Sequence, residues 1–195
     1  FYSGIVMSLG GLGAIVATKP FYILATSTTW NFAFLLSALT VVLLIFFIII
    51  FFPKKKVEHN VTKKEFNLSA FKQIIFSRNF LLMLPMSMFG YASFASILTL
   101  WGGKYLYLVH NINEGNISFI LMLMASFWSF GSLLYGYLEK KLRQKKVIII
   151  FSAVIVCILL SLLCFKFISS VMLLIIIFSL MGIFGGFTLI LLSHY

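Results

Sequence analysis

Long apolar runs alternate with short polar stretches along this chain. Six runs can be distinguished, at approximately residues 1–17, 32–52, 79–101, 116–138, 147–165 and 171–192. A helix rises about 1.5 Å per residue, so about 20 apolar residues are enough to cross the ~30 Å hydrocarbon core of a bilayer. The pattern therefore predicts an all-α integral membrane protein with six transmembrane helices.

The longest polar stretch, residues 53–78, lies between the second and third runs, and a basic cluster at residues 139–146 lies between the fourth and fifth. Because two runs separate them, both stretches lie on the same side of the membrane if every run crosses it once. They contain all 15 Lys and Arg residues except Lys19, Lys104 and Lys166. Loops rich in Lys and Arg stay in the cytoplasm, so the basic side is predicted to be cytoplasmic.

The composition excludes a soluble domain. Hydrophobic residues make up 62% of the chain and charged residues only 10%, with a mean hydropathy of +1.13, whereas soluble domains carry about 25% charged residues. The net charge of +11 would suit a nucleic-acid partner. The basic residues lie between apolar runs, however, and membrane topology explains that placement better. The predicted partner is the lipid bilayer, with no nucleic acid.

The first run is rich in glycine, at Gly4, Gly10, Gly11 and Gly13. Small residues let transmembrane helices approach closely, so this run is expected to pack tightly against another helix. A loop is predicted at residues 18–31, where Lys19-Pro20 breaks the helix.

The third run is the most polar and irregular of the six. A proline and a glycine inside one spanning helix, Pro85 and Gly90, predict a kink or local unwinding, and such a helix is expected to line a cavity. Ser87 and Tyr91 are four residues apart and share a face that would contact a substrate. The alternative is that Ser87 bonds to its own helix backbone and Tyr91 fills a gap in the core.

Three further residues are candidates for a substrate cavity. Lys104, in the predicted loop 102–115, would attract anionic substrates at the outer mouth, or it would only extend its charged end into water as lysines near helix ends do. Trp128 and Tyr135 lie seven residues apart on one face of the fourth run. They would line the cavity or pack against neighbouring helices.

Catalytic and metal-binding chemistry is scarce in this sequence. There is no aspartate, the four acidic residues are scattered glutamates, and no spacing of Cys, His or carboxylates suggests a metal site. Cys157 and Cys164 are about 10.5 Å apart by helical rise, beyond the reach of a disulfide, so they are expected to be small buried hydrophobic residues. We predict no cofactor, no metal and no enzymatic activity.

Several stretches resemble the major facilitator superfamily of secondary transporters. Residues 10–20, GGLGAIVATKP, look like the fifth helix of many bacterial members. Residues 30–34, WNFAF, are similar to the Gly-Trp-Arg-x-x-Phe pattern of the family, with Thr29 and Asn31 in place of its Gly and Arg. The long basic stretch looks like the cytoplasmic loop that joins two six-helix halves. Residues 136–146, GYLEKKLRQKK, resemble the Gly-x-x-x-Asp-Arg-x-Gly-Arg-Arg loop between helices eight and nine.

This signature loop departs from the family pattern at several positions. The residues that correspond to it are Gly136, Glu139, Lys140, Lys141 and Arg143. Glu139 lies one place before the motif acid, Lys140 occupies its position, and Arg143 stands where glycine is usual. The departures argue against a salt-bridge latch on this loop but leave its cytoplasmic placement intact.

The resemblance implies that the chain corresponds to helices five to ten of a twelve-helix fold with two bundles. Residues 1–52 would be the last two helices of the N-terminal bundle, 53–78 the loop between the bundles, and 79–195 the first four helices of the C-terminal bundle. The remaining helices of the full-length protein would be its partners. In such a fold the bundles rock about a central cavity, which the third and sixth runs would line.

The predicted function is secondary active transport of a small solute by alternating access. The alternative is a non-transporting membrane subunit or scaffold. A membrane-embedded enzyme is less favoured, because it would need clustered acids, histidines or a nucleophile. Enrichment in Ile, Phe, Lys and Asn is typical of an AT-rich bacterial genome, which favours a location in the bacterial inner membrane.

Overall fold

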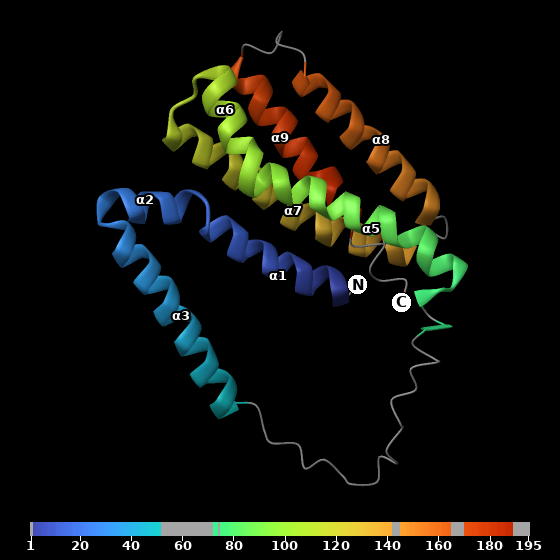
Figure 1. Cartoon of the computed structure of the whole chain (residues 1–195), viewed down its shortest axis with the longest axis horizontal. Helices are drawn as coiled ribbons and strands as arrows, with labels where there is room; N and C mark the ends of the chain where they lie inside the picture. The colour runs from blue at the N-terminus through green and yellow to red at the C-terminus, as the bar shows by residue number, and fades with distance from the viewer. Residues whose placement is uncertain (1, 52–71, 74, 142–144, 165–169, 189–195) are drawn as a thin grey trace. The chain divides into compact units, whose positions relative to one another are not determined.

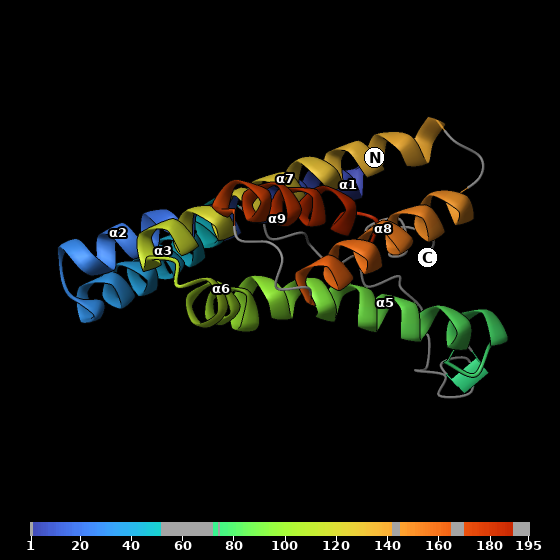
Figure 2. The same cartoon turned by 90° about the horizontal axis from the view of Figure 1, so that it is seen from above.

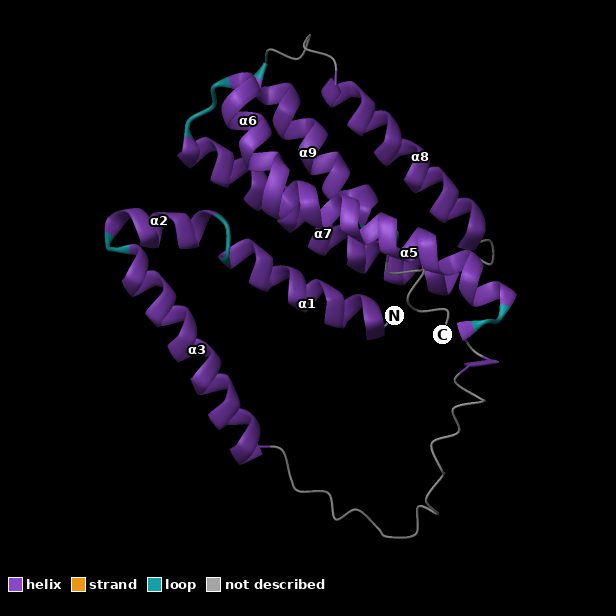
Figure 3. Ribbon diagram, in the orientation of Figure 1, coloured by secondary structure: helices purple, strands orange, loops and turns teal. Residues whose placement is uncertain are grey.

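The computed structural model describes residues 2–51, 72–73, 75–141, 145–164 and 170–188, and the regular structure there is entirely helical (Figures 1 and 3). The elements are α1 (Tyr2–Val16), α2 (Lys19–Ser27), α3 (Trp30–Phe51), α5 (Arg78–Ser96), the π-helix η1 (Ile97–Trp101), α6 (Gly102–His110), α7 (Glu114–Lys141), α8 (Lys145–Cys164) and α9 (Val171–Gly185). The all-α class is confirmed. Most of the predicted basic loop 53–78 lies outside the described residues.

Four described stretches are long and apolar enough to cross a membrane: Gly4–Ser27, Trp30–Phe51, Glu114–Leu138 and Lys146–Cys164. They overlap the first, second, fourth and fifth predicted runs. Helix α9, from the sixth run, is apolar but has only 15 residues, or about 22 Å. The third run, in α5 and η1, is not among the four. Several apolar helices of spanning length define a multi-pass integral membrane protein.

Two segments that were predicted to be loops are helical, so those predictions are wrong. Helix α2 begins at Lys19, and Lys19-Pro20 therefore starts a helix instead of ending one. Proline is tolerated in a first turn, where a backbone N–H has no helical partner in any case. Helix α6 fills most of the predicted loop 102–115 and ends before Asn111, which adopts the left-handed conformation with φ 50°.

The irregularity of the third run lies later than the sequence suggests. Helix α5 continues through Pro85 and Gly90, and the departure from α-helical geometry comes in η1. There the backbone N–H of Gly102 bonds to the carbonyl of Ile97, five residues earlier. A Cβ at Gly102 would collide with that carbonyl oxygen. A π-helix of this kind is an interruption of one turn and is frequent at functional sites.

Residues 1–22 and 83–195 form one compact unit, in which α7 is the central helix. Helices α1 and α9 both pack along α7, α8 packs on α9, and α6 packs on α7 (Figures 1 and 2). The core consists of buried apolar side chains from α6, α7 and α9, including Leu106, Ile120, Met124, Leu174, Phe178 and Met181. This packing holds the middle of α7 between its neighbours.

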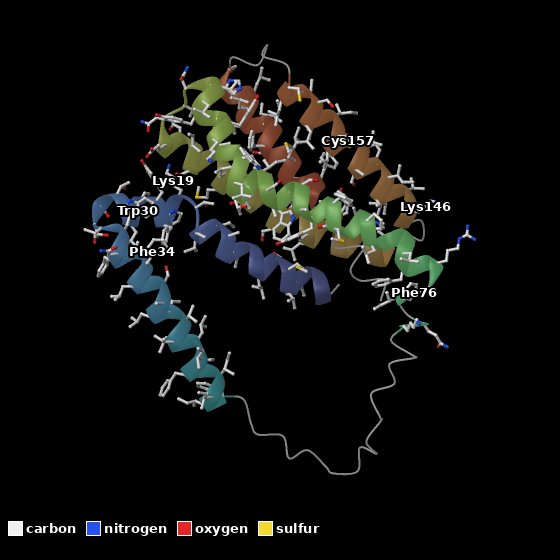
Figure 4. All side chains as sticks on the ribbon, viewed as in Figure 1. Lys19, Trp30, Phe34, Phe76, Lys146 and Cys157 are labelled. Atoms are coloured by element: carbon white, nitrogen blue, oxygen red, sulfur yellow. The ribbon has the colours of Figure 1, made fainter. Side chains whose placement is uncertain are left out.

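Residues 23–82 form the second unit. Its long helix α3 is apolar throughout, and Ala33 is the one buried residue of this fully described helix. Trp30 and Phe34 lie near its start (Figure 4), with ring centroids 6.5 Å apart. A helix that is apolar on all sides and exposed along its length is suited to contact with lipid.

The two cysteines are exposed on α8, so the prediction that they are buried is wrong. Cys157 (Figure 4) lies in a shallow apolar hollow on one face of α8, together with Ile150, Val154 and Ser161. Lipid tails are as apolar as a protein core. Low polarity therefore does not distinguish a buried position from a lipid-facing one, which is why the sequence misled.

Candidate functional site at the centre of helix α7

Trp128 lies close to the midpoint of α7 and stacks on Phe94 of α5. The two ring centroids are 5.3 Å apart and the ring planes are inclined by 21°. Phe94 is only 8% exposed, and it lies at the middle of the continuous helical stretch 78–110 that α5, η1 and α6 form. Two long helices therefore meet through aromatic rings at their centres.

Glycines of α9 bring its backbone against this aromatic pair. A Cβ on Gly185 would lie 3.0 Å from Cδ2 of Phe94 and 3.6 Å from Cδ1 of Trp128. A Cβ on Gly182 would collide with the backbone carbonyl of Met124. Small residues are the usual means by which membrane helices approach so closely. Three helices thus converge around Trp128.

Two buried polar atoms of α7 have no hydrogen-bond partner among the described residues. They are Nε1 of Trp128 and Oγ of Ser132. Ser132 is fully buried, with 0% exposure, and it lies one turn after Trp128 on the same face of the helix. Buried polar atoms are paired in the great majority of cases, and an unpaired one costs free energy. These are therefore two buried groups of α7 whose hydrogen-bonding capacity is unused among the described residues.

Ser129 of α7 connects this helix to α1. Its hydroxyl donates to the backbone oxygen of Ser8 at 2.8 Å, and the Ser8 hydroxyl donates in turn to Oγ of Ser129 at 3.1 Å, because each hydroxyl has one proton. A Cβ at Gly11 would lie 2.7 Å from Cβ of Ser129, and a Cβ at Gly4 would lie 3.2 Å from Cα of Gly136. We call these five residues the α1–α7 seam.

Tyr135, a predicted cavity residue, is 3% exposed and joins α7 to α8. Its hydroxyl is hydrogen-bonded to Ser152, and the Ser152 hydroxyl donates to the carbonyl of Ile148 at 2.8 Å. Because that bond uses the Ser152 proton, Tyr135 is the donor to Ser152. The polar atom of Tyr135 is therefore satisfied within the protein, unlike that of Trp128.

No described contact joins the other predicted cavity residues to Trp128. Tyr91 is 56% exposed on α5, and Ser87 lies one turn earlier in the same helix, with a side chain outside the described residues. Lys104 is exposed on α6, and its Nζ lies 5.5 Å from the ring centroid of Trp101. This cation–π contact gives Lys104 a partner on its own helical stretch.

The predicted signature loop is partly helical. Gly136 is buried in the α1–α7 seam, and Lys141 is exposed at the last position of α7. Glu139 and Lys140 belong to the same helix, but their side chains lie outside the described residues, as does the whole of Arg143.

Polar contacts also tie together the helix ends near the start of α7. Lys19, on α2 (Figure 4), places Nζ 4.5 Å from the ring centroid of Phe119. On α6, Tyr105 donates to the carbonyl of Leu163 at 2.7 Å, and its hydroxyl is 3.0 Å from Nε2 of His110. Because the Tyr105 proton is used in the bond to Leu163, Nε2 of His110 is the donor. These contacts fasten helices to one another.

Within the described residues, no group of three or more His, Cys or acidic side chains is placed to hold a metal ion. The centre of α7 instead offers an indole N–H, a hydroxyl and aromatic faces. Such groups recognise a molecule by hydrogen bonding and stacking.

The four apolar stretches of spanning length define a multi-pass helical membrane protein. The sequence matches the Major Facilitator Superfamily over residues 1–195, and the chain belongs to this family. No curated protein and no solved structure gives a significant match. Family membership agrees with the resemblance seen in the sequence and makes the chain a transporter of the major facilitator kind.

Sequence reasoning singled out Trp128 but missed Phe94 and Ser132. Ser132 carried a usable signal, since it lies four positions after Trp128 and therefore on the same face of the helix. Phe94 carried none, because it is one of 23 phenylalanines and only the fold shows which of them meets the indole.

Proposed function

We propose that this chain is part of a secondary transporter that moves a small solute by alternating access. The observation that carries the proposal is the unpaired polar pair of Trp128 and Ser132 at the centre of a spanning helix. Substrates of secondary transporters bind near the bilayer midplane, and polar groups at that depth are expensive and commonly functional. Family membership supports the same function.

In this proposal the chain has six crossings, equivalent to helices five to ten of a twelve-helix fold. The N-terminal bundle then includes α1 and α3, and the C-terminal bundle includes α5 to α9, so the α1–α7 seam lies where the two bundles meet. The seam consists of glycines and serines, without long side chains that interlock. Two such surfaces separate and rejoin with little side-chain rearrangement, which suits a contact that opens in every transport cycle.

Uptake into liposomes tests this function. Protein with Ser8→Cys and Ser129→Cys, in a background with Cys157 and Cys164 replaced by serine, would be reconstituted and supplied with solutes of different charge under a proton or sodium gradient. We expect saturable, gradient-dependent uptake of at least one solute class. Oxidation to a disulfide across the seam should stop it and reduction should restore it, because the two hydroxyl oxygens are only 3.1 Å apart in the native pair.

Two outcomes would count against the proposal. Uptake that continues after complete crosslinking would contradict alternating access at this seam. A protein with six crossings and no gradient-driven uptake of any solute would favour the alternative, a non-transporting membrane subunit or scaffold.

A further inference from the structure

We propose that Phe94, Trp128 and Ser132 bind an uncharged, flat and largely apolar molecule that carries a hydrogen-bond acceptor. This inference rests on the transporter function proposed above and names the class of solute that the central site would take.

The three contributing helices meet at the same depth. Trp128 is 14 positions after Glu114, or about 21 Å along the axis of α7. Phe94 is at the middle of the helical stretch 78–110, and Gly185 of α9 approaches both rings. Trp128 and Phe94 are therefore far from the ends of their helical stretches, whereas Gly185 is the last residue of α9. The middle of a helix that crosses the bilayer lies near the midplane, where water is scarce and protein groups must supply the recognition.

The hydrogen-bonding capacity of the site is specific. An indole N–H can only donate, so the molecule must present an acceptor to Trp128. The hydroxyl of Ser132 can donate to the same acceptor or accept from a neighbouring N–H or O–H. Two other α7 serines are already engaged: Ser126 donates to the carbonyl of Met122 at 2.8 Å, and Ser129 is paired with Ser8. Of these groups, only the N–H of Trp128 and the hydroxyl of Ser132 would gain a hydrogen bond from a ligand.

The helices that form the site carry no ionisable acid or base near their centres. No Asp, Glu, Lys, Arg or His lies between Arg78 and Lys104, between Glu114 and Glu139, or within residues 167–193. An anion would find no positive charge on these segments, and burying an unpaired charge at this depth is costly. Aromatic faces attract cations, but a cation would also meet the positive end of the indole N–H. An uncharged molecule avoids both penalties.

The aromatic stack sets the shape of the molecule. The Trp128 side chain is partly exposed, whereas its N–H is covered. In the proposed site the molecule enters between the rings of Phe94 and Trp128, whose centroids are 5.3 Å apart. A flat ring entering there would replace one ring–ring contact by two of the same kind, with offset-stacked or edge-to-face geometry.

Three probes of one shape separate the charge classes: benzamide is neutral, benzoate is its anionic counterpart and benzamidine its cationic one. Binding of each to the protein in lipid nanodiscs would be measured by equilibrium dialysis with labelled compound. We expect saturable binding of benzamide, with benzoate and benzamidine weaker by about tenfold or more, the effect of one buried interaction lost.

Conservative variants then locate the binding. Trp128→Phe keeps an aromatic ring but removes the N–H, and Ser132→Ala removes only the hydroxyl. Each should weaken benzamide binding by about fivefold to tenfold. The matched controls are Trp101→Phe, which removes an exposed indole, and Ser126→Ala, which removes a hydroxyl bonded within its own helix. Both should leave benzamide affinity unchanged.

A stability measurement distinguishes a ligand role of Ser132 from a structural one. Because the Ser132 hydroxyl is buried and unpaired, Ser132→Ala should leave the melting temperature of the ligand-free protein unchanged or raise it. A structural hydrogen bond at this position would make the same variant melt lower. Loss of benzamide affinity without loss of stability is therefore the expected signature.

Equal affinity for the three probes, undiminished benzamide binding in Trp128→Phe and Ser132→Ala, or no saturable benzamide binding would overturn the inference. Uptake into liposomes separates this failure from a failure of the transporter function. Gradient-driven uptake without benzamide binding would contradict only the proposed binding site at Phe94, Trp128 and Ser132. Benzamide binding as described, with no uptake of any solute, would contradict the transporter function and still support the binding site.

Discussion

The hydroxyl of Ser129 on α7 donates a hydrogen bond to the backbone carbonyl of Ser8 on α1, 121 positions earlier in the chain. The two helices are thereby joined by polar atoms inside an apolar bundle. Around this bond, Gly4 and Gly11 let the backbones approach. The strength and tightness of this contact can be measured.

Replacing Ser129 by alanine should lower the free energy of unfolding by about 0.6 kcal/mol and by no more than about 1.7 kcal/mol, the average and the maximum for hydrogen bonds between membrane helices. Unfolding in mixed micelles with increasing SDS fraction measures this quantity. Ser126→Ala is the matched control, because the Ser126 hydroxyl bonds only to Met122 of its own helix. Equal effects of the two substitutions would contradict an interhelical role for Ser129.

Alanine substitutions at the neighbouring glycines Gly10 and Gly11 of α1 should have different effects on the free energy of unfolding. A Cβ at Gly11 would lie 2.7 Å from Cβ of Ser129, so Gly11→Ala should push the helices apart and cost about 1–3 kcal/mol. Gly10 has nothing within 4 Å of an added Cβ, and Gly10→Ala should be neutral or stabilise the helix by up to about 1 kcal/mol. The same SDS titration applies, and a Gly11→Ala protein as stable as the Gly10→Ala one would refute the seam.

Tyr135→Phe should cost about 1 kcal/mol, because it removes the donor to Ser152 and leaves the rest of the ring in place. Tyr137, on the same helix, is 56% exposed, and Tyr137→Phe should have almost no effect. Thermal unfolding of the purified protein, followed by loss of helical circular dichroism, compares the two. If Tyr135 instead lined an open cavity, its substitution would be as mild as that of Tyr137.

Labelling of single cysteines tests the six crossings. In a background without Cys157 and Cys164, a membrane-impermeant maleimide applied to intact cells should label Lys104→Cys and Lys166→Cys. The variants Lys56→Cys and Lys141→Cys should be labelled only after the cells are opened, because the basic side is expected to face the cytoplasm. Labelling of Lys56→Cys or Lys141→Cys in intact cells would break the alternation on which the topology depends.

The sequence was sufficient to predict the membrane class, because runs of about 20 apolar residues have few other interpretations. It was also sufficient to expect close packing of the first helix, and Gly4 and Gly11 lie in contact with α7 as expected. Which of the four glycines make that contact was not predictable. That choice depends on how α1 is rotated against α7, which a local pattern does not contain.

The candidate site was only partly visible in the sequence. Trp128 stood out as a rare, large residue in the fourth run, whereas its partner Phe94 lies 34 positions earlier and is one phenylalanine among 23. The pairing of Tyr135 with Ser152 likewise needed the contact between α7 and α8. The prolines led to wrong predictions of helix ends and kinks. Lys19-Pro20 starts α2, and Pro85 lies inside the continuous helix α5. Proline is a weaker helix-breaking signal in a packed membrane helix, because neighbouring groups satisfy the freed backbone.

The π-helix η1 changes which face of the following helix α6 lies in line with the core-facing side of α5. Twelve positions separate Phe94 from Leu106, and an uninterrupted α-helix would place them about 120° apart around its axis. The extra residue in η1 removes about 100° of that angle, so both side chains come to lie on the same face, where they are 8% and 0% exposed. A helical wheel drawn across residues 78–110 would therefore assign the wrong face to α6. Deleting a single residue from 97–101 would remove the π-turn and leave eleven α-helical positions between the two side chains, about 20° apart, so Leu106 would keep its place in the core.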